Sequence, residues 1–331
     1  MSISPIVSVN MITYNHELYI AKAIEGVLNQ KTNFLFELVI GEDCSTDNTK
    51  KIVLEYQRKF PHIIKVITSS NNVGMIKNSI RTALACDGKY IAYCEGDDYW
   101  HNPDKLQIQV DFLEHNPEYG MVHSNADLFD TRSGKLHDSY LKLIADLDDA
   151  NAYFEILTDT RHVFTPTVCV RRDLLVDIIK NNPECSSERF LMGDLQIWLE
   201  ISHVSKVKYF PESLATYNFL EESATQSKNP IKLLQFEQSF KELILLYLAK
   251  YDCPEEIRRQ ALSRITPTLL RLAIFANDRS VIKREIVEMR SLGLEKSLNW
   301  RERLICWCSD SVIKFSLILC IKKIWAIIKR P

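Results

Sequence analysis

The feature that most constrains the fold is an alternation of short apolar runs with helical stretches in the first 125 residues. Apolar runs with the length of strands occupy residues 6–12, 36–40, 63–68, 90–94 and 120–124. Between them, residues 16–30, 46–60 and 75–87 carry apolar side chains at helical spacing. Strands that alternate with helices of this length are typical of parallel strands joined by right-handed crossovers. The sequence therefore predicts an α/β fold, with a mostly parallel, Rossmann-like sheet flanked by helices.

The alternation of strand-like and helical stretches ends near residue 125. Residues 162–175 are typical of a loop and a strand that enter a helix, and 207–211 of a further strand. From 229 to 299 the helical pattern dominates. The sequence thus predicts an α/β domain over 1–228, a helical region over 229–300 and a basic amphipathic tail over 301–331.

The composition fits a folded protein and excludes some functions. Of the 331 residues, 46% are hydrophobic, which is enough to bury a sizeable core. The 41 Lys and Arg nearly balance the 43 Asp and Glu, so a net charge of −2 gives no general attraction for nucleic acid. The nine cysteines lack paired metal-binding spacing, and no basic region with a long apolar run opens the chain. We expect a cytoplasmic protein with reduced thiols and no nucleic-acid partner.

Three polar clusters follow predicted strands. They are "TYN" (13–15), "GEDCSTDNT" (41–49) and "EGDDYW" (95–100). Ligands of open parallel sheets bind beyond the carboxyl ends of the strands. Glu42 and Asp43 stand directly at a strand end, before the position where a helix cap is required. Three such clusters predict a binding site at one edge of the sheet.

The third cluster indicates what is bound. Glu95, Asp97 and Asp98 repel one another unless a cation or hydrogen-bond donors offset their charge. Carboxylate oxygens suit Mg²⁺ or Mn²⁺, and Mg²⁺ commonly takes further ligands from substrate phosphates. Gly96 lets the backbone approach a ligand closely. The pattern favours a site for a metal and a diphosphate, with a solvated acidic turn as the alternative.

These motifs, in this order, resemble the inverting glycosyltransferases of family 2, which have the GT-A fold. The resemblance covers about residues 6–225. "VSVNMITYN" is similar to the first strand and nucleotide loop, and "FELVIGEDCSTDNT" to the next strand and turn, with Glu42 in place of an Asp. "NNVGMIKNSIRTALACDGKYIAYCEGDDYW" leads to Glu95-Gly96-Asp97 where the family has D-x-D. "GDLQIWLEI" resembles E-D-x-x-x-W-L, with Gly193 replacing the Glu and Asp194 retained.

The resemblance implies a metal-dependent, inverting transfer of a sugar from a UDP-, GDP- or dTDP-sugar to a saccharide or lipid-linked acceptor in cell-surface polysaccharide biosynthesis. Residues 1–228 would be the catalytic domain. Asp194 would be the general base, and Asp97, with Glu95 and Asp98, would bind Mn²⁺ or Mg²⁺. The implied nucleotide-binding residues are Thr13, Tyr14, Asn15, Asp43 and Lys77.

Two other functions remain open at this point. A sugar nucleotidyltransferase would show a Gly-rich loop ending in basic residues after the first strand, and residues 11–19 contain no glycine. A non-catalytic module that binds nucleotide sugar would not need both Asp97 and Asp194. The chemistry of a glycosyltransferase does need them, because a metal offsets charge on the leaving diphosphate and a separate base activates the acceptor hydroxyl.

The C-terminal segment 309–331 predicts contact with a membrane surface. Its longest apolar run, 315–321, is far shorter than the ~20 residues that span a bilayer. Lys314, Lys322 and Lys323 bound this run, and Trp325 suits the headgroup region. Such a basic amphipathic helix lies in the membrane interface, here on the cytoplasmic face. The alternative is a terminal helix that packs on the protein's own core.

Overall fold

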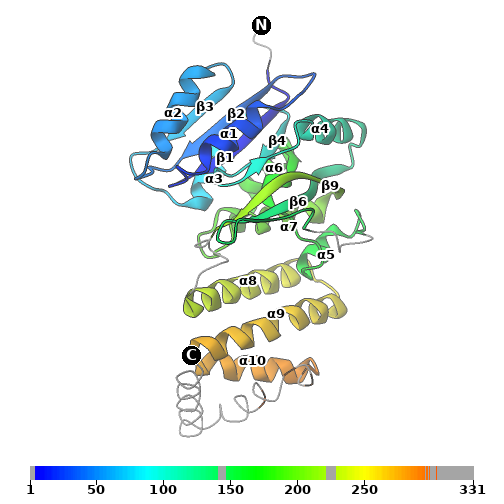
Figure 1. Ribbon diagram of the computed structural model, residues 1–331. Coiled ribbons are helices and arrows are strands. Elements are labelled where there is room, and N and C mark those ends of the chain that lie inside the picture. The colour runs from blue at the N-terminus through cyan, green and yellow to red at the C-terminus, as the bar shows by residue number, and fades with distance from the viewer. Residues whose placement is uncertain are drawn as a thin grey trace. The chain divides into compact units, whose positions relative to one another are not determined.

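Four parallel strands form the first half of the sheet in the computed structural model, which describes residues 4–140, 147–220 and 229–294 together with Lys296, Leu298 and Arg303. They pair in the order β3-β2-β1-β4. Their bounds are β1 Val7–Thr13, β2 Phe36–Glu42, β3 Ile64–Thr68 and β4 Tyr90–Tyr93. Each begins within one residue of the predicted position, so the apolar runs located these strands correctly (Figure 1).

The second half of the sheet is mixed. β8 (Cys169–Arg171) runs antiparallel to β4, and β6 (Tyr119–Asp130) runs antiparallel to β8. β9 (Lys206–Phe219) pairs in parallel with β6, and the short strands β5 (Tyr99–Trp100) and β7 (Lys135–His137) pair antiparallel to β9 and β6. The α/β class is therefore confirmed, and parallel strands make up one half of the sheet. β6 and β9 extend well past the short runs seen in the sequence.

Helices cover both faces of this sheet. Their bounds are α1 Ile20–Leu28, α2 Thr49–Lys59, α3 Met75–Leu84, α4 Lys105–His115, α5 Ala152–Leu157, α6 Arg172–Asn181 and α7 Leu195–Val204, with the 3₁₀ turns η1 Thr165–Thr167 and η2 Pro183–Ser186. Alternate residues of β1 face opposite ways. Val9 packs in a cluster with Ile24 of α1, whereas Asn10 donates from Nδ2 to the Ser79 carbonyl of α3 at 3.2 Å. Both faces of β1 are buried.

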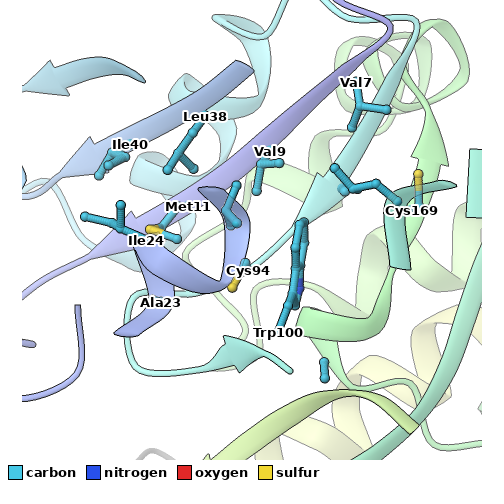
Figure 2. Packing of buried hydrophobic residues seen from close by; sticks show 14 of the residues in the cluster. Val7, Val9, Met11, Ala23, Ile24, Leu38, Ile40, Cys94, Trp100 and Cys169 are labelled. Carbon is cyan, nitrogen blue, oxygen red and sulfur yellow. The ribbon is translucent and has the colours of Figure 1, made fainter. Parts of the chain in front are cut away.

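The main hydrophobic core lies on the α1 side of the sheet. It joins Val7, Val9 and Met11 of β1 with side chains of α1, α2, α4, β2 and β4. Figure 2 shows Met11 beside Ala23 and Ile24, with Trp100 and Cys94 in the same cluster. Because Cys94 and Trp100 flank the acidic residues 95–98, this core fixes both ends of the segment expected to bind a ligand.

The helical region forms a second compact unit, which also includes Leu157–Asp159. Its described helices are α8 (Pro230–Lys250), α9 (Glu255–Ala276) and α10 (Arg279–Ser291). Asn229 and Asp278 start α8 and α10 by accepting backbone N–H groups with their side chains. In this unit the buried Lys241 ammonium lies 2.5 Å from Glu285 and 2.6 Å from Glu288, so its charge is compensated.

The predicted membrane-binding segment 309–331 lies outside the described residues. Within the part of the chain that the structure describes, no helix is both long enough and apolar enough to cross a membrane.

Gly26 lies where α1 packs closely against the backbone of β5. A Cβ atom at residue 26 would lie 2.7 Å from the backbone oxygen of Trp100 and 3.0 Å from its nitrogen. Replacing glycine by alanine inside a helix normally stabilises by roughly 0.5–1 kcal/mol. Here we expect Gly26→Ala to destabilise by about 1–3 kcal/mol, because the overlap is with backbone. Urea unfolding measures the change.

The control for this prediction is Ala21→Gly in the same helix, which reports the ordinary helix propensity of α1. A Gly26→Ala variant as stable as the wild type, or more stable, would contradict the packing described.

Candidate active site

In-register pairing brings the ends of three strands to one edge of the sheet. Thr13 of β1 pairs with Glu42 of β2, and Asn10 of β1 with Tyr93 of β4. The chain after β4 continues beside β1, since the Gly96 N–H donates to the Ile12 carbonyl at 2.9 Å. The three polar clusters predicted from the sequence therefore meet at this edge.

Gly96 is required by this close approach. A Cβ atom at residue 96 would lie 2.6 Å from Thr13 Oγ1 and 2.8 Å from Thr13 Cβ. The acidic segment consequently passes directly over the end of β1, where the Thr13 hydroxyl is buried without a hydrogen-bond partner.

Four carboxylates share this edge: Glu95, Asp97 and Asp98 from the segment after β4, and Asp194 from the start of α7. Burial raises the pKa of Glu95 well above its ordinary value, and the charges of Asp97 and Asp194 raise it further. Among the described residues, no lysine or arginine forms an ion pair with any of the four. His16 is the nearest basic group, with Nδ1 at 4.0 Å from Asp97 Oδ1.

Asp98 is the most deeply buried of these four carboxylates, at 1% exposure. Its Oδ1 accepts the Asn218 N–H at 2.7 Å, whereas its Oδ2 is buried without a hydrogen-bond partner. Burial, followed by the charges of Asp97 and Glu95, raises the pKa of Asp98 well above its ordinary value. One oxygen of Asp98 thus serves the fold, and the other is left for a ligand.

Asp194 comes from a different element. It is the N-cap residue of α7, yet its side chain accepts no helix N–H. Instead, Asp194 Oδ2 accepts a hydrogen bond from the Thr165 hydroxyl of η1 at 2.6 Å. Pro166, which follows Thr165 in η1, accepts the Trp100 Nε1–H at 2.8 Å, so the turn that holds Asp194 also contacts the end of the acidic segment. The charge of Asp194 raises the pKa of both Glu95 and Tyr93. The side chain is therefore held in the site instead of capping its helix.

On the other side of the site, Asp43 organises the loop before α3. Its carboxylate accepts the Val73 N–H at 2.9 Å and the Gly74 N–H at 3.0 Å, and Arg81 lies 3.5 Å away. The Asp43 N–H donates to the carbonyl of Thr13 at 3.1 Å. The structure thus brings Asp43 and Thr13 together, with Asp43 already bonded to backbone.

Side chains of the loop after β1 help to fix its conformation. Asn15 has a left-handed backbone (φ 56°), and its Oδ1 accepts the Thr46 N–H at 2.8 Å. Tyr14 is 42% exposed and so presents its ring to solvent. Lys77 forms a 3.0 Å ion pair with Glu188, both side chains being exposed. Lys77 thus makes its ion pair outside the four-carboxylate group.

Sequence reasoning missed two site residues on β9. The charges of Asp98, Glu95, Asp97 and Asp194 act on the Tyr217 hydroxyl, and with its burial, which has the larger effect, they raise its pKa. The neighbouring Asn218 side chain donates to the Asp97 carbonyl. Only 207–211 was identified as a strand, so the continuation "ATYNF" (215–219) carried no signal of its proximity.

The residues present fit a divalent cation that takes part of its coordination from a substrate. Within the described ranges, no three His, Cys, Asp or Glu side chains are arranged to hold a metal by themselves. Mg²⁺ is typically bound through one or two carboxylates plus substrate phosphates. The unbonded Asp98 Oδ2 and the crowded carboxylates of Glu95 and Asp97 offer that donor set.

A family model described as Glycosyl transferase family 2 matches residues 8–176, about half of the chain. The chain belongs to glycosyl transferase family 2. The match covers the four parallel strands from residue 8 on, the polar clusters and the acidic segment described above, whereas β9 lies beyond it. Three of the four carboxylates thus lie within the matched residues, and Asp194 lies outside them.

Curated relatives match shorter stretches. An uncharacterized protein of Mycobacterium tuberculosis is 41% identical over 111 residues, which cover 34% of this chain and 32% of that protein. The putative teichuronic acid biosynthesis glycosyltransferase TuaG of Bacillus subtilis is 34% identical over 109 residues, 33% of this chain and 42% of TuaG. The chain therefore spans about a third to two fifths of the length of these relatives.

Solved structures resemble this family 2 chain over most of its length. S. aureus TarS 1–349 in complex with UDP-GlcNAc has a TM-score of 0.55 at 17% identity, covering 87% of this chain and 88% of that one. The mannosyltransferase PcManGT from Pyrobaculum calidifontis, in complex with GDP-Man and Mn²⁺, has a TM-score of 0.52 at 14% identity, covering 96% and 87%. At these identities the likeness shows the GT-A fold alone, and the predicted architecture is confirmed.

The raised pKa of Glu95 predicts how stability depends on pH in protein freed of metal with EDTA. A carboxyl whose pKa is higher in the folded state stabilises the fold at low pH, and this contribution is lost as pH rises above its ordinary value of 4.5. Glu95→Gln should therefore raise the thermal midpoint at pH 8, by about 2–4 °C for each kcal/mol gained. The difference should shrink toward pH 4.5.

Thermal unfolding from pH 4.5 to 8 makes this measurement. Glu118→Gln, at an exposed surface position, is the control and should leave the pH profile unchanged. A Glu95→Gln midpoint at pH 8 that equals or falls below the wild-type value would contradict the claim that the ionised Glu95 carboxylate destabilises the fold.

Proposed function

We propose that this chain is a metal-dependent, inverting glycosyltransferase that moves a sugar from a nucleotide-diphosphate donor to a hydroxyl of a saccharide or lipid-linked acceptor. The observation that carries the proposal is the convergence of Asp194 with Glu95, Asp97 and Asp98, without a lysine or arginine ion pair among the described residues. Uncompensated carboxylates are costly unless a ligand uses them.

The roles follow from the position of each carboxylate. Asp97, with Glu95 and Asp98, would hold the cation at the end of β4. When bound, Mn²⁺ or Mg²⁺ supplies Lewis-acid stabilisation to the leaving diphosphate. Asp194 arrives from α7 and would take the proton of the acceptor hydroxyl as that oxygen attacks the anomeric carbon. A single displacement from the side opposite the diphosphate inverts that carbon.

The nucleotide would lie along the ends of β1 and β2. Tyr14 would contact the nucleotide base. Asp43, Thr13 and Asn15 would line the rest of the nucleotide site. Asp43 retains acceptor capacity on a carboxylate that already receives two backbone N–H groups. Lys77 would reach the nucleotide only by leaving Glu188, an exposed pair of the kind worth about 0–1 kcal/mol.

The names of similar proteins support the substrate class. TarS has been solved with UDP-GlcNAc, PcManGT with GDP-Man and Mn²⁺, and TuaG is named for teichuronic acid biosynthesis. From these names we propose that this chain uses a nucleotide-sugar donor, which is UDP-, GDP- or dTDP-linked. We also propose that it acts in cell-surface polysaccharide synthesis. A thermal-shift screen of nucleotide sugars with Mn²⁺ identifies the donor, because a ligand of the native state raises the midpoint.

The proposal also covers the parts of the chain. Residues 1–228 would be the catalytic domain and 229–300 a helical region, in a cytoplasmic protein. The tail 301–331 would attach it peripherally to the inner face of the membrane, with 309–331 in the interface. Sedimentation with anionic vesicles, with and without residues 309–331, tests this attachment. Equal sedimentation of both forms would refute it.

Release of nucleoside diphosphate separates the proposal from its alternatives. A glycosyltransferase hydrolyses or transfers from the identified donor when Mn²⁺ is present, whereas a binding module releases no nucleoside diphosphate. A sugar nucleotidyltransferase would instead form nucleotide sugar from a sugar phosphate and a nucleoside triphosphate.

Asp97→Ala should abolish metal-dependent nucleotide binding while leaving the fold intact. The diphosphate would lose the cation that offsets its charge, so binding of UDP, GDP or dTDP with Mn²⁺ should weaken at least about tenfold, roughly 1.4 kcal/mol. Isothermal titration calorimetry measures the affinity. Asp173→Ala, a change at a fully exposed aspartate, is the control. Unchanged affinity in Asp97→Ala would overturn the metal assignment.

Asp194→Asn should lower turnover by roughly two to four orders of magnitude, because the amide keeps the shape but cannot accept a proton. Donor affinity should stay nearly unchanged, since Asp194 is assigned to the acceptor side. Nucleoside diphosphate release from the identified donor gives the rate. Near-normal turnover would show that another carboxylate is the base, with Glu200 or Asp127 the next to test.

A further inference from the structure

The Thr165 hydroxyl forms a hydrogen bond with Asp194, the proposed base. Resting on the proposed function of Asp194 as the base, we infer that Thr165 is a positioning residue that holds this carboxylate in its reactive orientation, and that η1 is the rigid support for both. Thr165 Oγ1 donates to Asp194 Oδ2 at 2.6 Å. This leaves Asp194 Oδ1 to receive the acceptor hydroxyl.

A threonine suits this task. Its branched Cβ restricts the side chain to few rotamers, so the hydroxyl points in a defined direction. Hydrogen bonds to an ionised carboxylate are short and strong. Asp194 makes no side-chain cap on α7. Thr165 is thus the hydrogen-bond donor that the described structure gives to this carboxylate.

Two buried side chains hold the turn that carries Thr165. The Trp100 Nε1–H donates to the Pro166 carbonyl at 2.8 Å, and Gln109 Nε2 donates to the Thr167 carbonyl at 2.7 Å. Both of these side chains are buried, and they come from different elements, β5 and α4. The carbonyls of two successive residues of η1 are therefore fixed from the core.

Lys105, which is fully buried, contacts the two side chains that hold η1. Its ammonium donates to Gln109 Oε1 at 2.7 Å and lies 4.2 Å from the centroid of the Trp100 ring. A charge buried this deeply is costly unless it is bonded, and here its contacts lock Gln109 and Trp100 in place.

This arrangement ties the base to the metal-side carboxylates. Trp100 follows Asp98 by two residues, so the same side chain that ends the acidic segment also holds the turn beneath Asp194. The two catalytic halves of the site would keep their spacing because they share one buried support.

The test compares Thr165→Val, which removes the hydroxyl and keeps the shape, with Thr165→Ser, which keeps the hydroxyl. With the nucleotide sugar identified by thermal shift and with Mn²⁺, we expect Thr165→Val to lower kcat by about 10- to 100-fold through misplacement of the base. The donor Kd, measured by calorimetry, should stay within about twofold, roughly 0.4 kcal/mol. Thr165→Ser should recover most of the rate. Thr165→Ala serves if the valine variant does not fold.

Thr32→Val is the matched control. The Thr32 hydroxyl also donates to a backbone carbonyl, that of Phe34, at 2.7 Å, and Thr32 lies outside η1 and the candidate site. This variant should keep kcat near the wild-type value. In an Asp194→Asn background, Thr165→Val should cause no further loss, because residues that act through one contact are not additive.

Three outcomes would overturn the inference: a Thr165→Val variant with wild-type kcat, an equal loss of kcat in Thr32→Val, or an undiminished loss in the Asp194→Asn background. Failure of the proposed function is a different result, because the wild-type protein would then release no nucleoside diphosphate from any nucleotide sugar.

Discussion

The parallel, in-register pairing of β1 with β2 and β4 is the constraint on which the site depends. Because the strands run the same way, Thr13 and Glu42 end level with each other, and the segment after β4 runs on beside Ile12. A slip of one residue in β1 would exchange its two faces, moving Asn10 into the apolar side and Val9 out of it. The hydrophobic core therefore fixes the position of the polar edge.

The two compact units handle buried charge in opposite ways. In the helical unit, Lys241 is surrounded by Glu285 and Glu288, so opposite charges offset each other. At the sheet edge, Glu95 and Asp98 face other carboxylates, and burial, followed by the repulsion of these charges, raises their pKa values. The first arrangement is complete within the protein. The second leaves like charges together, which is the pattern expected of a functional site.

Local pattern predicted the parallel strands and the acidic segment, because both are encoded in neighbouring residues. The arrangement of the mixed half of the sheet was not predicted, since β8 and β9 pair with strands far away in the chain. Asp194 was found only through the family resemblance. Neither Tyr217 nor the bond between Thr165 and Asp194 had a local signal, because these contacts arise from long-range packing.

The contact between Gly96 and Thr13 has an evolutionary consequence. Any side chain at residue 96 would occupy the space of the Thr13 side chain and press on Ile20. A relative that gains a side chain at residue 96 must therefore shorten residue 13 or displace the acidic segment from β1. The two positions are expected to vary together, and a side chain at residue 96 should be rare without a smaller residue at position 13. The middle residue of the acidic motif, which carries no chemistry of its own, would thus be restricted by packing against its neighbour on β1.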